Sequence, residues 1–379
     1  MTSRDPNRLL QAELGVVTRV FASRPGAQEL QVRVGNREES AVGYTRLLGE
    51  LQPGERVLLN TTAVRAGLGS GGYHFVMKGE SEDREGDSVS DASGFRGHVV
   101  KLRYTPLQFR CLSVEEQESP HREAIEACDG LAEMPVIVGA LHSHIAPAVA
   151  AAKALLPELR IAYLMTDAAA LPLAFSKLVT DLRAAGLVDA TITTGQAFGG
   201  DYEAVNVYTG MLAARAVVGA QVVVIAQGPG NVGTETEWGF GSIAQGEHIN
   251  AAAVLGGIPI GVPRISFADP RPRHRGVSRQ SLVALGRVAL VEAIVSVPQM
   301  DPERLELVHR QLDDEGITEK HEVLVAQGEC GLEELVRRGL EVKSMGRSVE
   351  QDPEFFLAAA AAGAIAAERV RWASTSENA

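Results

Sequence analysis

Apolar positions near the start of the chain fall into short runs that predict β-strands. The runs are rich in β-branched and aliphatic residues, and turn signals such as Arg24-Pro25-Gly26 and Pro53-Gly54-Glu55 separate them. The predicted strands are Leu14–Ala22, Gln28–Val34, Ser40–Tyr44, Arg56–Thr62 and Tyr73–Met77. Strands this short and this closely spaced predict a small β barrel or sandwich over residues 1–79.

The hydrophobic pattern changes at His98, after which short apolar runs alternate with longer helical patterns. The predicted strands are Val99–Arg103, Val136–Leu141, Ile161–Met165, Ala190–Thr193, Val222–Ala226, Ile260–Phe267, Val323–Ala326 and, more weakly, Leu340–Ser344. The predicted helices are Pro120–Cys128, Ala146–Leu156, Leu173–Ala185, Glu203–Val218, Ile243–Leu255, Arg279–Ala293 and Pro353–Trp372, the last with Asp352 as N-cap. This alternation predicts an α/β domain over residues 98–379, with a mostly parallel, Rossmann-like sheet between two layers of helices.

An acidic segment separates the two predicted domains. Residues 80–97 carry many carboxylates and almost no large apolar side chain, so they cannot form a core and predict a linker. A chain of 379 residues is long enough for this arrangement of two domains.

Composition narrows the functional classes. The net charge of −12 argues against nucleic acid or an anionic membrane as partner. The 3 cysteines are far apart in the chain, which argues against a disulfide framework and favours a reduced cytoplasm. The polar N-terminus shows no stretch of signal-peptide length, and Leu357–Ala367 is shorter than the ~20 apolar residues of a membrane span. We therefore expect a cytoplasmic protein.

Ligands of open parallel sheets bind beyond the carboxyl ends of the strands, so polar residues that follow predicted strands are the candidates. His142 and His144 follow one strand, and in an extended segment residues two apart share a face and would bind one metal ion or one substrate. The alternative is one structural and one solvent-facing histidine. Asp167 follows the next predicted strand. It would serve as a metal ligand, a general base or a ribose partner, and the alternative is a helix cap.

Two glycine-containing loops follow the next predicted strands. In the first, the candidate ligand-binding residues are Gln196, Gly199, Gly200 and Asp201, with Asp201 alternatively a helix cap. In the second, Gly228, Gly230 and Gly233 satisfy G-x-G-x-x-G and, with Asn231 and Thr234, would cradle a phosphate at the N-terminus of the next helix. A dinucleotide site also needs an acidic residue ~20 residues further on. The next strand-end acid, Asp269, is too far along, and a tight structural turn is the alternative.

An arginine-rich loop follows the predicted strand Ile260–Phe267. Five arginines lie within 16 residues, namely Arg264, Arg271, Arg273, Arg275 and Arg279. Guanidinium groups bind carboxylate and phosphate in bidentate fashion, so Arg271 and Arg273 predict an anion clamp. His274 in the same loop would act as acid, base or ligand. The alternatives are a salt-bridged surface and a contact between the subunits of a homo-oligomer.

These strand ends would meet at one edge of the sheet. We expect it to gather His142, His144, Asp167, Asp201, Asp269 and His274 near the glycine loop. Histidine with aspartate suits a divalent metal such as zinc or manganese, and His142, His144 and Asp167 are the predicted ligands. The predicted catalytic set is His142, His144, Asp167, Asp269 and His274. No G-x-S-x-G motif occurs and none of these loops contains a cysteine, which disfavours covalent catalysis through a serine elbow or a cysteine of these loops.

Several of these motifs resemble a known family. The segments Gly67–Phe75, Ala140–Ile145, Gly195–Asp201, Gly228–Thr234 and Arg264–Asp269 resemble a bacterial family catalogued as domain of unknown function 3866. The resemblance implies a bacterial protein of about this length and brings no activity with it.

Three functions remain open from the sequence. The first is an enzyme that acts on a small anionic substrate, for example a metal-assisted hydrolase. The second is a non-catalytic protein that binds a nucleotide or small molecule. The third is a dinucleotide-dependent oxidoreductase.

Overall fold

The computed structural model describes residues 9–68, 70–79 and 97–376. The described residues divide into two compact units, one of residues 9–68, 70–79 and 104–109 and the other of residues 97–103 and 110–376. The predicted linker at 80–97 lies, apart from Gly97, outside the described residues. Each unit has its own hydrophobic core.

The first unit is a closed β-barrel with strand order β1-β2-β3-β5-β4. Its strands are β1 (Ala12–Arg24), β2 (Ala27–Val34), β3 (Arg37–Gly43), β4 (Arg56–Asn60) and β5 (His74–Gly79), and its short helices are α1 (Thr45–Leu48) and α2 (Thr62–Arg65). Strands β3 and β5 are parallel and the other pairs antiparallel, a connectivity of the OB-fold kind. Leu30, Val32, Leu51 and Leu59 fill the interior. The prediction of a small barrel or sandwich is thus confirmed, as a barrel.

The second unit contains an eight-stranded parallel sheet of order β11-β10-β9-β12-β8-β13-β16-β17. Its strands are β8 (Pro135–Gly139), β9 (Ile161–Thr166), β10 (Ala190–Thr194), β11 (Tyr202–Ala204), β12 (Val222–Gln227), β13 (Ile258–Val262), β16 (Ile294–Pro298) and β17 (Glu322–Ala326). The consecutive strands β8 and β9 are not neighbours, because β12 lies between them. The short strands β6 (Val99–Lys101), β7 (Phe109–Cys111), β14 (Ile265–Ser266) and β15 (Gly276–Val277) lie outside this sheet.

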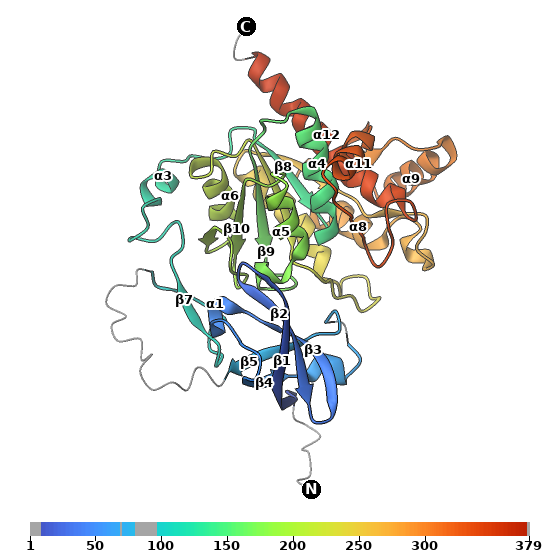
Figure 1. The fold of residues 1–379 in the computed structure, drawn as a ribbon. Coiled ribbons are helices and arrows are strands. Elements are labelled where there is room, and N and C mark those ends of the chain that lie inside the picture. Colours follow the sequence, from blue (N-terminus) through green and yellow to red (C-terminus); the bar gives the residue numbers. More distant parts are fainter. Residues whose placement is uncertain (1–8, 69, 80–96, 377–379) are drawn as a thin grey trace. The chain divides into compact units, whose positions relative to one another are not determined.

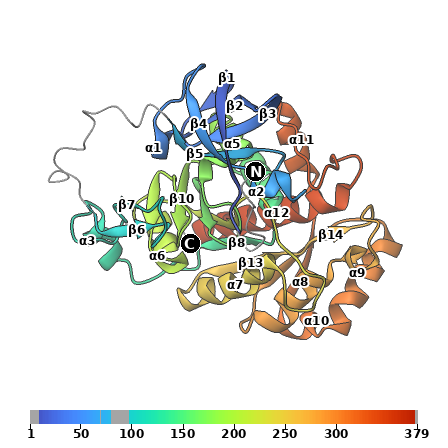
Figure 2. The ribbon, with the colours of Figure 1, turned by 90° about the horizontal axis from the view of Figure 1, so that it is seen from below.

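Helices cover both faces of the sheet, as the apolar strands predict. The helices are α3 (Arg122–Glu126), α4 (Ile145–Leu155), α5 (Lys177–Ala184), α6 (Val207–Ala216), α7 (Ala244–Val254), α8 (Arg279–Val283), α9 (Pro302–Asp314), α10 (Ile317–Lys320), α11 (Glu329–Arg337) and α12 (Pro353–Ser376). Along β8, Val136 and Val138 pack into one core with α6 and α7, whereas Ile137 packs into the other with α4 and α12. Figure 2 shows α7 and α8 on the opposite side of β8 and β13 from α11. Figure 1 shows α4 beside α12, its neighbour in the other layer. The three-layer prediction is confirmed.

Some predicted elements differ from the observed ones. The predicted helix Arg279–Ala293 ends early, in a π-helical turn at Ala284–Val288, and the sheet strand β16 that follows was not predicted. The predicted strand Ile260–Phe267 breaks after Val262, where Pro263 cannot donate a ladder hydrogen bond. Residues 340–344 form a loop rather than a strand. None of the helices among the described residues is long and apolar enough to span a bilayer.

Candidate functional site

A cavity of about 970 Å³ lies in the larger unit beyond the carboxyl ends of β8, β12 and β13. Its wall comes from five stretches of chain, at residues 141–143, 175–181, 229–235, 264–280 and 341–347. The chain leaves β8 toward β9 on one side and leaves β12 toward β13 on the other. The cavity therefore lies where the winding of the sheet reverses, which is the place where parallel sheets bind ligands.

Positive charge dominates the wall of this cavity. The cationic lining residues are Lys177, Arg264, Arg271, Arg273, Lys343 and Arg347, and the acidic ones are Asp181, Glu235, Asp269 and Glu341. The cations outnumber the carboxylates, although the chain as a whole carries a net charge of −12. The cavity wall is therefore locally positive in a protein whose net charge is negative, as an anion site requires.

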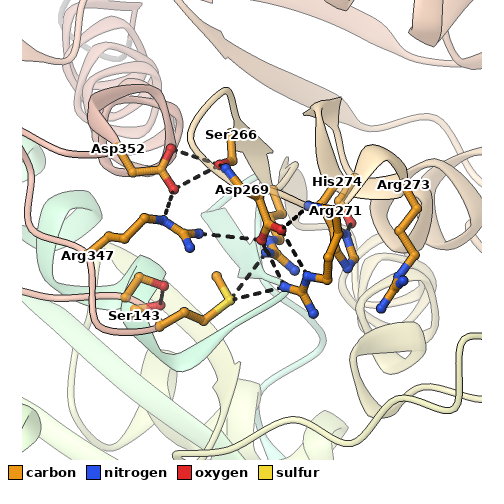
Figure 3. A network of polar contacts seen from close by, with 12 residues as sticks. Ser143, Ser266, Asp269, Arg271, Arg273, His274, Arg347 and Asp352 are labelled. Carbon is orange, nitrogen blue, oxygen red and sulfur yellow. Dashed lines mark hydrogen bonds and ion pairs between the residues drawn. The ribbon is translucent and has the colours of Figure 1, made fainter.

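Three arginines converge on the carboxylate of Asp269 (Figure 3). Arg264 donates from Nη2 to Oδ2 at 2.5 Å, and Arg271 donates from Nε and Nη2 at 2.9 and 2.8 Å. Nη2 of Arg347 lies 3.5 Å from the same oxygen, Oδ2. The bonds from Arg271 and the charge of Arg264 hold the pKa of Asp269 well below its usual range. Even with Asp352, which also pairs with Arg347, two carboxylates face three guanidinium groups, so the cluster keeps an excess of one positive charge.

A second carboxylate fixes this cluster to the last helix. Asp352, predicted as the N-cap of α12, accepts a bond from the Ser266 hydroxyl at 2.8 Å and from Nε of Arg347 at 2.9 Å. The Ser266 hydroxyl in turn accepts the backbone N–H of Asp269 at 3.1 Å. Asp352 thus orients both an arginine and the loop that carries Asp269 (Figure 3).

Arg264 is the buried member of the cluster, with 5% of its surface exposed. Burial lowers the pKa of Arg264 to about 10, and the nearby charges of Arg271 and Arg347 act in the same direction. Its Nε is buried without a hydrogen-bond partner among the described residues. Its Nη2 also points at the thioether Sδ of Met345, 3.2 Å away. A thioether is a weak acceptor, so an oxyanion would satisfy these donors better.

His274 lies in the wall beside this cluster. Nδ1 of its ring bonds to the Ser278 hydroxyl at 2.7 Å, which leaves Nε2 as the ring nitrogen for a ligand. Burial and the charges of Arg264 and Arg271 lower the pKa of His274 to about 4, so the ring is neutral at pH 7.

His142 lies in the wall formed by the β8 and α5 segments and pairs with a serine. Its Nε2 is 2.7 Å from Oγ of Ser176, and its Nδ1 is 3.2 Å from the backbone carbonyl of Gln227 at the end of β12. A carbonyl can only accept, so Nδ1 carries the proton and Nε2 accepts from the serine. Burial lowers the pKa of His142 to about 4, which keeps the ring neutral. Sequence reasoning missed Ser176, although a serine at the start of a helical pattern is a recognisable N-cap signal.

The predicted metal cluster does not form. His142 and His144 lie in a 3₁₀ helix rather than an extended segment, so residues two apart point in different directions. His144 is 1% exposed, packs against Phe355 with ring centroids 4.7 Å apart, and lines no part of the cavity. Asp167 accepts the backbone N–H of Gln196 at 2.9 Å. Among the described residues, no three His, Cys, Asp or Glu side chains lie close enough together to hold a metal ion.

The G-x-G-x-x-G loop contributes to the wall without the expected helix. Gly230, Asn231 and Gly233 line the cavity, but α7 begins only at Ala244, after a 3₁₀ turn. Asn231 accepts the backbone N–H of Ser242 at 3.0 Å and so holds that turn. Gly228 is needed for packing, because a Cβ there would lie 2.2 Å from the carbonyl oxygen of Ala170. The loop therefore lacks the adjoining helix N-terminus of a phosphate cradle.

The loop after β10 lies outside the cavity lining. Asp201 accepts from the backbone N–H and hydroxyl of Thr191 at 2.8 and 3.0 Å and also pairs with Arg183. The amide of Gly199 donates to Glu203 at 2.7 Å, and a Cβ at Gly200 would lie 3.0 Å from two backbone atoms. These contacts make the segment a compact turn between β10 and β11.

The cavity thus gathers half of the predicted site residues. Those that line it are His142, Gly230, Asn231, Gly233, Asp269, Arg271, Arg273 and His274. Those outside its lining are His144, Asp167, Gln196, Gly199, Gly200, Asp201, Gly228 and Thr234. Besides Ser176, sequence reasoning missed Arg347, which lies just beyond the weak strand pattern Leu340–Ser344.

Comparison with known proteins assigns no activity to this cavity. The model of a family described as a protein of unknown function, DUF3866, matches residues 40–363, which is most of the chain. No curated protein and no solved structure shows significant similarity to the chain.

Proposed function

We propose that this protein, which belongs to the DUF3866 family, is an enzyme that acts on a small substrate with a phosphate or carboxylate group. The family has no assigned activity. The arginine cluster carries the proposal. Arg264, Arg271 and Arg347 have two carboxylates between them, Asp269 and Asp352. Nε of the buried Arg264 has no partner among the described residues. Unpaired buried donors are costly, and an oxyanion in the cavity would satisfy them.

The remaining wall suits a small molecule. A volume of about 970 Å³ lies within the range of small-molecule and cofactor sites. Two neutral imidazoles, His142 and His274, line it and supply a proton acceptor and a donor. Asp269 acts as an anchor for the arginines, because its depressed pKa makes the carboxylate a poor base.

A non-catalytic binding protein is the second candidate, and the saturation of the cluster favours it. Asp269 and Asp352 are both fully engaged in holding arginines, so neither carboxylate is available for proton transfer. Such a site would bind an anion without converting it, as in a regulatory or sensor protein. Turnover of a bound anionic compound distinguishes the two candidates.

The test compares two arginines of equal exposure. Arg271 lines the cavity and Arg279 does not, and the side chain of each is 44% exposed. Binding of inorganic phosphate, nucleoside phosphates and dicarboxylates is measured by calorimetry for the wild type, Arg271→Met and Arg279→Met. A charge-assisted hydrogen bond contributes about 1.5–3 kcal/mol, so we expect Arg271→Met to weaken binding about 10- to 100-fold.

Arg279→Met is expected to bind within about twofold of the wild type, because Arg279 pairs with Glu237 and Glu315 instead. Equal losses in the two variants, or no binding of any of these anions by the wild type, would contradict the proposal.

A further inference from the structure

A part of the cavity wall outside the arginine cluster carries a serine that is hydrogen-bonded to a neutral imidazole. Ser176 and His142 both line the cavity, with Oγ and Nε2 2.7 Å apart. The backbone carbonyl of Gln227, 3.2 Å from Nδ1, fixes the tautomer in which Nε2 is the free base. This is the relationship between a serine nucleophile and its general base, with a carbonyl in the place of the usual carboxylate.

The local structure also stabilises negative charge on the serine oxygen. Ser176 is the N-cap of α5, and its Oγ accepts the backbone N–H of Val179 at 3.1 Å. The first-turn amides of a helix and its dipole favour an anion at this end. The hydroxyl proton thus faces a base, while the oxygen faces hydrogen-bond donors.

We propose that Ser176 is a nucleophile, with His142 as its general base, in the hydrolysis of small esters that carry a phosphate or carboxylate group. The inference rests on the anion pocket proposed above, because the arginine cluster would hold the charged end of the ester in the same cavity. Ser176 lies outside any G-x-S-x-G motif, so its sequence does not reveal this role.

The reaction runs in two balanced steps. In the first, Oγ of Ser176 bonds to the ester carbonyl carbon and its proton passes to Nε2 of His142. The bond from that carbon to the alkoxy oxygen then breaks, and the alcohol leaves with the proton from Nε2. In the second, water attacks the acyl carbon and gives a proton to Nε2. The acyl–Oγ bond then breaks, the proton returns to Oγ, and the net reaction converts ester and water into acid and alcohol.

A short-chain alkyl fluorophosphonate tests the nucleophile directly. Oγ displaces fluoride at phosphorus, and intact-protein mass spectrometry detects the adduct. We expect one adduct in the wild type, on the peptide that contains Ser176, and none in Ser176→Ala. Ser143→Ala is the matched control, since Ser143 lines the same cavity but bonds to Ser344, 2.9 Å away.

His142→Gln separates catalysis from packing. Loss of a general base lowers rates about 10²- to 10⁴-fold, so labelling should fall by at least that lower factor. Because burial lowers the pKa of His142 to about 4, the labelling rate should hold nearly constant from pH 8 down to pH 5. A base with the ordinary pKa of about 6.5 would lose roughly 30-fold over the same range.

Phosphate binding, measured by calorimetry on the same preparations, keeps the two proposals separate. Phosphate binding with no adduct, or with an adduct on a residue other than Ser176, overturns the nucleophile and leaves the anion pocket standing. A His142-dependent adduct on Ser176 supports the nucleophile. If phosphate does not bind, the anion pocket and the charged substrate class fail, while the nucleophile stands.

Discussion

His144 offers a quantitative test of how the larger unit is packed. The ring is 1% exposed, it lies against Phe355, and neither of its nitrogens has a hydrogen-bond partner among the described residues. Burial lowers the pKa of His144 from 6.5 to about 3. Between these two values the unfolded chain binds a proton that the folded chain does not. The free energy of unfolding therefore decreases as the pH falls below 6.5.

The size of the effect follows from the two pKa values. Integrating the proton linkage from pH 8 to pH 5 gives a loss of about 2 kcal/mol from this one side chain. His144→Leu removes the titrating group, so the variant should lose about 2 kcal/mol less than the wild type over that range. At pH 8 it should also be about 1–3 kcal/mol more stable, because two unpaired polar atoms have been replaced by apolar ones of similar volume.

Urea unfolding followed by tryptophan fluorescence is the appropriate measurement. The chain has 2 tryptophans, Trp238 and Trp372, and both belong to the larger unit, so the signal reports that unit alone. His144→Gln is the control: it should lose the same ~2 kcal/mol of pH dependence as His144→Leu, without the gain at pH 8. An equal change in unfolding free energy between pH 8 and pH 5 in all three proteins would refute the reasoning.

Two further predictions concern stability. Asp269→Asn removes the carboxylate that pairs with Arg264 and Arg271, while Arg347 keeps Asp352. It should cost about 3–5 kcal/mol in urea unfolding, with phosphate restoring more stability to the variant than to the wild type. Equal stabilisation of both proteins by phosphate would count against a shared anion site. Gly363→Ala should lower the melting temperature, because a Cβ there would lie 2.0 Å from the carbonyl oxygen of Ala148 in α4, and overpacking outweighs the ~1 kcal/mol gain in helix propensity. A higher melting temperature would show that α4 and α12 pack less closely than described.

The fold was largely predictable from the sequence because its signals are local. Branched, apolar runs separated by turns predicted every barrel strand. Runs apolar on both faces predicted the parallel sheet except for β11 and β16, and the predicted strand Val99–Arg103 lies outside it. The misses also have physical causes. Ile294–Pro298 continues an apolar helical pattern, so periodicity alone did not show that the helix ends in a π turn before it.

The site was only half predictable, because strand-end position does not fix where a side chain points. Arg271 and His274 follow a central strand and reach the cavity. Asp201 instead turns back to Thr191, near the start of β10. His144 was placed by assuming extended backbone where a 3₁₀ turn occurs. Arg347 comes from a loop some 80 residues beyond the other arginines of the cluster, and no short motif links them.

The position of β12 between β8 and β9 has a consequence for synthesis of the chain. As the polypeptide leaves the ribosome, β8 and β9 emerge with no strand to join them until residues 222–227 follow. Their inner edges stay unpaired during that interval, and unpaired apolar edges invite association with other chains. The same late strand carries the carbonyl that orients His142, so in a nascent chain the serine–histidine pair lacks this contact until the middle of the sheet has closed.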